Sequence, residues 1–444
     1  MVLTRRLLIT ALALSVVILV LPATVWVCAA AVMLLVIADV LLAASPRRVR
    51  VVREDTPAVR AGEPVTARTL VENVGSRTLR GQVKDGWQPS AGARRPVQDV
   101  TIPAGERQLV EVPLRPQRRG NLRSEHLTVR SVGPLGMAGR QVVHRVPHAQ
   151  RVLPPFSSRK HLPSKLQRLR ELDGATAVQR RGAGTEFDSL RDYVHGDDVR
   201  SIDWRATARR HSSAGQHLVV RTWRPERDRR VILCLDASRT SAARIGGVSP
   251  DDQTGAADQP RLDTSMEAAL LLGALASSAG DRVDFLAFHR DLVSQASSRS
   301  AGDFLHSMAH AMSQVSPVMM EADFSQLPAE VAAISSQRSL VVILTSLGSA
   351  SLQEGLLPVL PALTAKHRVL IASVQDPELT RRITARQTVA DVYSAAAAER
   401  SLIESEALIA ELSALQVDVV EETPENLPPA LADAYIRLKA SGKL

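Results

Sequence analysis

The chain has 444 residues, 45% of them hydrophobic, which is enough for two or more domains with cores of their own. Its net charge of +9 is unevenly spread, because residues 1–230 hold 39 basic and 20 acidic residues, a net of +19, whereas residues 231–444 hold 16 and 26, a net of −10. Such a basic half suits an anionic membrane surface or nucleic acid. Nucleic acid is disfavoured because aromatic residues make up only 3% of the chain.

The first 48 residues predict a membrane anchor of two transmembrane helices. Residues 7–44 contain a single charge, Asp39, and Pro22 stands near the middle. A span needs roughly 20 apolar residues, so this run suits two short helices joined by a tight turn. Arginines precede and follow the pair, which places both ends in the cytoplasm. Asp39 is expected to reach the membrane interface. A cleaved signal peptide is the alternative, but its apolar region is usually about 7–15 residues.

Residues 49–155 predict a small β-sandwich-like domain. Short runs of β-forming residues, such as 65–73, 97–102 and 108–114, are separated by turn residues. This segment shows no catalytic motif and is expected to be a spacer or a protein-binding module. Residues 156–214 predict a linker with a short helix, followed by a charged segment.

Residues 215–444 predict an α/β domain of Rossmann type. Almost wholly apolar runs at 230–235, 340–345 and 369–374 alternate with helical patterns. Such strands form a mostly parallel sheet covered on both faces, and ligands of these sheets bind at the carboxyl ends of the strands. Asp236, Ser238 and Thr240 lie at that position and are candidate ligands of Mg²⁺ or Mn²⁺, which prefer oxygen. The alternative is that they cap the following loop and helix.

The segment 182–210 has the densest mixture of charged and aromatic residues in the chain. Acids and arginines alternate with apolar residues, which indicates a docked segment rather than a disordered tail. We expect Trp204 to be buried and Arg–Asp pairs to hold the segment on the next domain as a strap; a contact with a partner protein is the alternative. The candidate residues are Glu186, Arg191, Asp197, Arg200, Asp203, Trp204 and Arg209.

This segment resembles the signature of a bacterial family known as domain of unknown function 58. The resemblance rests on Gly182, Glu186-Phe187, Leu190-Arg191, Tyr193, Gly196-Asp197, Arg200, Ile202-Asp203-Trp204 and Thr207-Ala208-Arg209. It implies membrane attachment and a von Willebrand factor A-like domain. It also implies two partners, a MoxR-family AAA+ ATPase and a transglutaminase-like membrane protein.

The loop that begins at Asp236 is similar to the D-x-S-x-S metal loop of von Willebrand factor A domains. In that family a later strand usually supplies a further Asp, whereas this chain has Thr345 and Ser346 there. Asp323 is a further candidate oxygen ligand. With one sure carboxylate, the resemblance implies a degenerate site with low affinity for a divalent cation.

The favoured function is a non-enzymatic scaffold or adaptor in the cytoplasmic membrane that serves envelope protein maturation or assembly. A G-x-x-x-x-G-K-[ST] loop and a G-x-S-x-G elbow are both absent from the sequence, and neither Cys28 nor Cys234 fits a reactive thiol or a metal site. Two alternatives stay open: a hydrolytic enzyme of unknown substrate, and an exported adhesin, which would need the opposite topology. The sequence does not identify the partner, the pathway or the oligomeric state.

Overall fold

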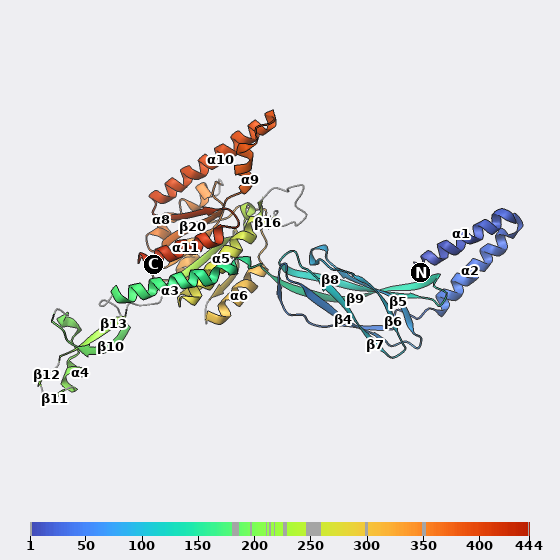
Figure 1. Cartoon of the computed structure of the whole chain (residues 1–444), viewed down its shortest axis with the longest axis horizontal. Coiled ribbons are helices and arrows are strands. Elements are labelled where there is room, and N and C mark those ends of the chain that lie inside the picture. Colours follow the sequence, from blue (N-terminus) through green and yellow to red (C-terminus); the bar gives the residue numbers. More distant parts are fainter. Residues whose placement is uncertain are drawn as a thin grey trace. The chain divides into compact units, whose positions relative to one another are not determined.

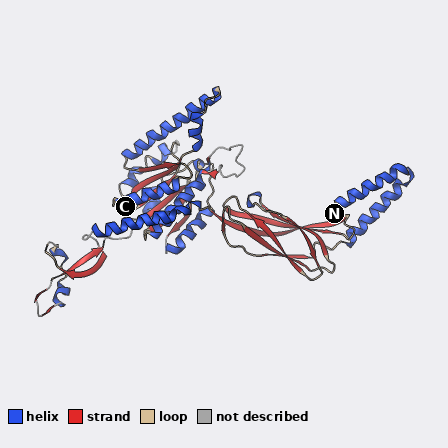
Figure 2. Cartoon of the chain, in the orientation of Figure 1, coloured by secondary structure: helices blue, strands red, loops and turns tan. Residues whose placement is uncertain are grey.

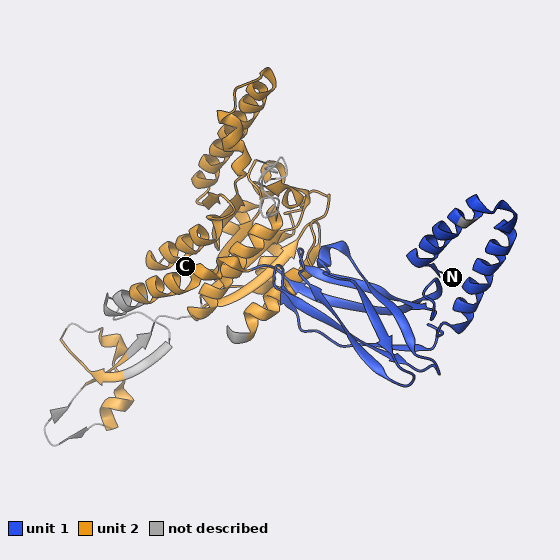
Figure 3. Cartoon of the chain, turned by 45° about the vertical axis from the view of Figure 1, so that its right-hand side comes forward, with its two compact units in different colours: residues 1–155 blue, residues 156–444 orange. Residues whose placement is uncertain are grey.

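In the computed structural model the described residues are 2–179, 186–195, 198–209, 211–212, 215–216, 218–224, 229–245, 259–297, 301–348, 352–442 and 444. The contacts divide the chain into two units, Met1–Pro155 and Phe156–Leu444 (Figure 3). The first unit combines a helical pair with β-strands, and the second is mixed α/β (Figure 2).

The first unit begins with strand β1 (Val2–Leu3) and two helices, α1 (Arg5–Val20) and α2 (Val25–Leu42), which form a hairpin around the 3-10 turn η1 (Pro22–Thr24) (Figure 1). Pro22 ends α1 because proline lacks an N–H and disfavours helix in the residue before it. By length and composition, Pro22–Leu42 could cross a membrane. At 1.5 Å per residue, α1 reaches roughly 24 Å, less than the roughly 30 Å of a hydrocarbon core. The structure therefore supports one apolar span, and the second remains a proposal.

The rest of the first unit is made of two facing sheets. The larger sheet has the order β1-β9-β8-β5-β6, with β3 paired to β9, and the smaller has the order β2-β4-β7. The strands are β2 (Val49–Arg53), β3 (Val59–Arg60), β4 (Val65–Asn73), β5 (Leu79–Trp87), β6 (Val97–Ile102), β7 (Arg107–Leu114), β8 (Gly120–Val132) and β9 (Ala138–Leu153).

Alternating burial along these strands builds one apolar core between the sheets. In β7, for example, Val110, Val112 and Leu114 are buried while the residues between them are exposed. Because successive side chains of a strand point to opposite faces, this alternation lets one face pack and the other meet solvent. Val71, Leu79 and other apolar side chains from both sheets complete the core.

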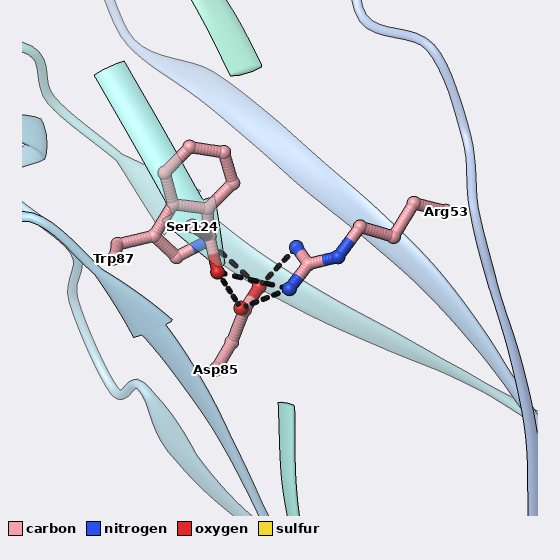
Figure 4. A network of polar contacts seen from close by, with 4 residues as sticks. All are labelled: Arg53, Asp85, Trp87 and Ser124. Atoms are coloured by element: carbon pink, nitrogen blue, oxygen red, sulfur yellow. Dashed lines mark hydrogen bonds and ion pairs between the residues drawn. The ribbon is translucent and has the colours of Figure 1, made fainter. Parts of the chain in front are cut away.

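One ion pair lies inside this unit. Arg53 donates to Asp85 at 2.8 and 3.1 Å, Ser124 donates to the same carboxylate at 2.7 Å, and Nε1 of Trp87 does so at 2.7 Å (Figure 4). The side chains of Arg53 and Asp85 are both buried. A buried charge is tolerated only when it is paired and hydrogen-bonded, and this network meets that condition for the carboxylate.

The second unit contains a six-stranded sheet with the order β18-β17-β14-β19-β20-β21, in which only β18 runs antiparallel. The strands are β14 (Arg230–Asp236), β17 (Arg282–Phe288), β18 (Leu292–Ser297), β19 (Leu340–Leu344), β20 (Arg368–Val374) and β21 (Asp418–Glu422). β14 and β19 are almost wholly buried, as parallel strands covered on both faces must be. The predicted mostly parallel sheet is therefore present.

Helices cover both faces of this sheet (Figure 1). On one face, Ile232 and Cys234 pack in a cluster with residues of α7, α8 and α10. On the other, Leu233 meets α5 and α6 around Gly273. The helices of the unit are α3 (Leu162–Gln179), α4 (Trp204–Arg209), α5 (Arg261–Ser278), α6 (Ala301–Ser313), α7 (Leu327–Ile334), α8 (Leu360–Thr364), α9 (Pro377–Thr384), α10 (Val389–Ala414) and α11 (Leu427–Ala440).

Candidate functional site

The loop after β14 lies at the point where the chain order of the sheet reverses. From β14 the chain first adds β17 on one side and later β19 on the other. Ligands of open α/β sheets bind at such a switch point, outside the carboxyl ends of the strands. Leu235 lies opposite Leu344 in the register, so Asp236 and Thr345 leave the sheet side by side.

Hydrogen bonds from the protein itself satisfy the Asp236 carboxylate. Oδ1 accepts from the backbone N–H of Ser238 at 2.8 Å, and Oδ2 accepts from the hydroxyls of Thr345 at 2.7 Å and Thr240 at 3.3 Å. Asp236 is only 1% exposed. Burial raises the pKa of Asp236, and these hydrogen bonds oppose that rise. The structure thus brings Asp236, Ser238 and Thr240 together, with Thr345 as a hydrogen-bond partner of the carboxylate.

These residues do not fit a divalent cation. Both carboxylate oxygens of Asp236 already accept from the protein, and the guanidinium of Arg261 donates to the hydroxyl of Ser346 at 2.6 Å and to the carbonyl of Thr240 at 3.4 Å. Within the described residues there is no group of three His, Cys, Asp or Glu side chains that could hold a metal. Asp323 instead accepts from the N–H of Ser325 in its own loop. The capping interpretation holds for the loop, where Asp236 accepts from the N–H of Ser238, but no side chain caps the 3-10 turn Arg239–Ala242 or α5.

The signature segment folds as a small β-ribbon with a short helix. Strand β10 (Glu186–Asp192) pairs antiparallel with β13 (Val219–Arg224), and Ile202 bridges to Val220 beside them. Helix α4 (Trp204–Arg209) follows and is attached through Thr207, whose buried hydroxyl accepts from the N–H of Val219 at 3.0 Å. Other short elements here are η4 (Val199–Ser201), β11 (His211–Ser212) and β12 (Gly215–Gln216).

Asp203 holds this fold together. Its Oδ1 accepts from the N–H groups of Arg205 and Ala206 at the start of α4, and its Oδ2 pairs with Arg221 of β13 at 2.7 Å. The hydrogen bond from Ala206 and then the bond from Arg221 hold the pKa of Asp203 below its usual value. A carboxylate at a helix start satisfies N–H groups that have no partner within the helix. An Arg–Asp pair therefore occurs, but its arginine lies on β13, which pairs with β10 and is not part of the six-stranded sheet.

The prediction that Trp204 is buried is wrong, because 66% of this side chain is exposed. Trp204 begins α4, and this short helix is attached to β13 through Thr207. Val194 and Val199 of the same segment are 61% and 63% exposed, and Leu190 is exposed as well. The segment thus presents several large apolar side chains to solvent.

The other signature residues have simpler environments. Glu186 begins β10, and Asp197 lies outside the described residues. Arg191 is exposed and donates to the carbonyl of Asp192, and Arg200 and Arg209 are exposed. Arg261 is the residue of the sheet-edge site that sequence reasoning missed, whereas Thr345 was noted only as standing where a further Asp is usual.

The comparison with protein families concerns most of this second unit. Residues 189–382 match the model of the family described as "Protein of unknown function DUF58". This part of the chain is similar to the DUF58 family. The resemblance predicted from the signature is thereby confirmed over this segment. No curated protein matches the chain.

Several solved structures are similar to parts of the chain at low identity. A von Willebrand factor type A protein from Catenulispora acidiphila is 11% identical with a TM-score of 0.28; the match covers 49% of this chain and 43% of that one. An uncharacterized membrane-spanning protein from Vibrio fischeri is 13% identical with a TM-score of 0.17; the match covers 47% of this chain and 96% of that one. The PilB minor pilin from Streptococcus sanguinis is 7% identical with a TM-score of 0.33; the match covers 82% of this chain and 88% of that one.

Proposed function

We propose that this DUF58 protein is a membrane-anchored, non-enzymatic adaptor that binds a partner protein through its signature segment. The apolar helix Pro22–Leu42 supports the anchor. The two-span hairpin with cytoplasmic ends is supported by the arginines at both of its ends, Arg5 and Arg6 before it and Arg47 and Arg48 after it. The α/β domain, of von Willebrand factor A type by its Asp236 loop, supplies the body that carries the segment.

The observation that supports the binding surface is the exposure of Trp204. Large aromatic side chains and arginines are the residues that dominate binding energy at protein interfaces. Here Trp204 lies on the same short segment as exposed Arg200 and Arg209, and the Asp203–Arg221 pair holds this segment. A strap packed on its own domain would bury this indole, so its exposure favours the contact with a partner.

The partner class follows from the family resemblance. We propose a MoxR-family AAA+ ATPase, with a transglutaminase-like membrane protein as a further member of the assembly. The Asp236 loop is not the contact in this proposal, because its carboxylate is buried and already hydrogen-bonded.

The alternatives find less support in the described residues. Burial raises the pKa of Cys234, so this thiol is not a nucleophile. At the carboxyl end of β14, the carboxylate of Asp236 is satisfied by its own loop and by Thr345. An exported adhesin would rely on a metal at this loop, and its residues do not fit one.

The test is co-purification of tagged full-length protein from detergent-solubilised membranes, read by mass spectrometry. We expect an AAA+ ATPase with the wild-type protein, its loss with Trp204→Ala, and its retention with Asp236→Ala. Tyr393→Ala is the matched control, because Tyr393 on α10 is also a largely exposed aromatic residue, at 76%. Recovery that survives Trp204→Ala would exclude the signature as the contact, and loss with Tyr393→Ala would point to a surface on α10.

A further inference from the structure

Both ends of the helical hairpin are fastened to the same turn of the β-unit, residues 133–138 between β8 and β9. At the first end, the backbone N–H of Thr4 donates to the carbonyl of Met137 at 3.0 Å, and its hydroxyl donates to the carbonyl of Gly136 at 2.5 Å. At the second, the buried carboxylate of Asp39 accepts from the N–H groups of Leu135, Met137 and Ala138 at 2.7–2.8 Å. The end of the β-unit is therefore held at the base of the hairpin.

Two arginines of the β-unit donate hydrogen bonds to carbonyl groups at the C-terminal end of α2. Nε of Arg140 donates to the carbonyl of Val40 at 3.0 Å, and a guanidinium N–H of Arg77 donates to the carbonyl of Leu41 at 2.7 Å. The last carbonyls of a helix have no partner within it, and cations at that end are favoured by the helix dipole. Each guanidinium has five N–H donors, so further donors remain available.

Four more arginines surround this junction. Arg5 and Arg6 follow Thr4, and Arg6 lies against Gly136. Arg47 and Arg48 follow α2, and Arg48 lies against Gly75, near Arg77. We name these six residues the arginine collar: Arg5, Arg6, Arg47, Arg48, Arg77 and Arg140.

The collar carries positive charge without a counter-charge. Among the described residues, none of its six members has a carboxylate within ion-pairing distance. Asp39 is the acid at the junction, and both of its oxygens accept from backbone N–H groups. The collar begins where the apolar sequence of the hairpin ends. If the hairpin inserts into a membrane, the collar arginines lie at the depth of the lipid phosphates.

We propose that the arginine collar binds the headgroup phosphate of an anionic phospholipid. A guanidinium presents a planar pair of donors that matches phosphate geometry, and basic clusters beside a membrane helix attract anionic lipid. This inference rests on the membrane anchor of the proposed function and is independent of the protein partner. It adds a second contact, by which the β-unit is held against one kind of membrane surface.

The test is native mass spectrometry of the full-length protein in a nonionic detergent, with phosphatidylglycerol or phosphatidylcholine added. We expect the wild-type protein to retain phosphatidylglycerol preferentially. Arg47→Gln with Arg48→Gln should weaken this retention on the order of tenfold, because each arginine near a lipid surface contributes measurably to binding. Both side chains are exposed and make no hydrogen bond in the described structure, so the fold should be unaffected.

The matched control is Arg118→Gln with Arg123→Gln. These two arginines are also exposed but lie toward the opposite end of β8 from the turn. Equal retention of the two lipids, or equal loss with both pairs of substitutions, would overturn the proposal. A second variant, Arg77→Gln with Arg140→Gln, should also lose the lipid. The assay contains no membrane and no partner protein, so its result does not depend on the anchor or on the adaptor function. Flotation with vesicles tests the anchor, and the co-purification described above tests the adaptor function.

Discussion

Oδ1 of Asp39 lies 2.1 Å from the place where a Cβ atom at position 133 would be, so only glycine fits at Gly133. The carbonyl oxygen of Asp39 lies 2.3 Å from the same place. These distances are far below van der Waals contact, and one of the contacting atoms belongs to the backbone. The missing side chain of Gly133 is therefore what lets the end of α2 dock on the β8–β9 turn.

Gly133→Ala should loosen this junction. We expect a loss of about 1–3 kcal/mol in the free energy of unfolding of the first unit, as for other overpacked sites. The amides of Leu135, Met137 and Ala138 should exchange faster with deuterium in detergent, because their acceptor is displaced. Gly105→Ala is the control. Its φ of +78° also disfavours a residue with a side chain, but a Cβ atom there meets no other atom within 4 Å. Unchanged exchange in Gly133→Ala would refute the docking.

The buried ion pair of the first unit should contribute far more to stability than an exposed pair of the same unit. Asp85→Ala leaves the guanidinium of Arg53 buried without its counter-charge, with the hydroxyl of Ser124 as a remaining acceptor, which costs about 3–5 kcal/mol in the free energy of unfolding. Glu111→Ala removes the exposed pair with Arg68 and should cost less than about 1 kcal/mol. Calorimetric unfolding of the two variants gives the comparison, and similar losses would contradict it.

The pH dependence of stability should report the burial of Asp236. Its pKa is raised in the folded protein above the ordinary value of 3.8, so the folded state binds the proton more readily than the unfolded state. Stability from this group is present at low pH and is lost as the pH rises from about 4 through the folded pKa. Asp236→Asn removes this dependence.

Denaturant unfolding of wild type and Asp236→Asn at a series of pH values measures the effect. The wild-type protein should lose stability relative to the variant as the pH increases over this window. A difference that stays constant, or one of the opposite sign, would show that the carboxylate is not held in a desolvated site. Asp391→Asn is a control, because Asp391 lies at the exposed start of α10 and its pKa is lowered.

Divalent cations should not stabilise the protein. Since the oxygens of Asp236 accept from protein donors and Arg261 donates to Ser346, addition of Mg²⁺ or Mn²⁺ should leave the unfolding temperature unchanged. A ligand that binds the folded state raises this temperature with its concentration, so the measurement is direct. A rise that is lost in Asp236→Ala would show that the loop rearranges to bind metal.

The sequence by itself determined the regular elements of this protein. The runs at β14, β19 and β20 are apolar because strands of a covered parallel sheet meet helices on both sides. The alternation in β7 has a period of two because one face of its sheet meets solvent. The signature segment could likewise be matched to its family, because such a match depends on the order of residues alone.

The tertiary structure decided which side chains meet. Asp39 and Gly133, and Asp236 and Thr345, are about a hundred residues apart, so no periodicity relates them. The environment of Trp204 depends on which side of a short helix faces β13, and a six-residue helix has too few positions to show a pattern. Burial and hydrogen bonding at these positions follow from packing between distant segments, which local sequence does not encode.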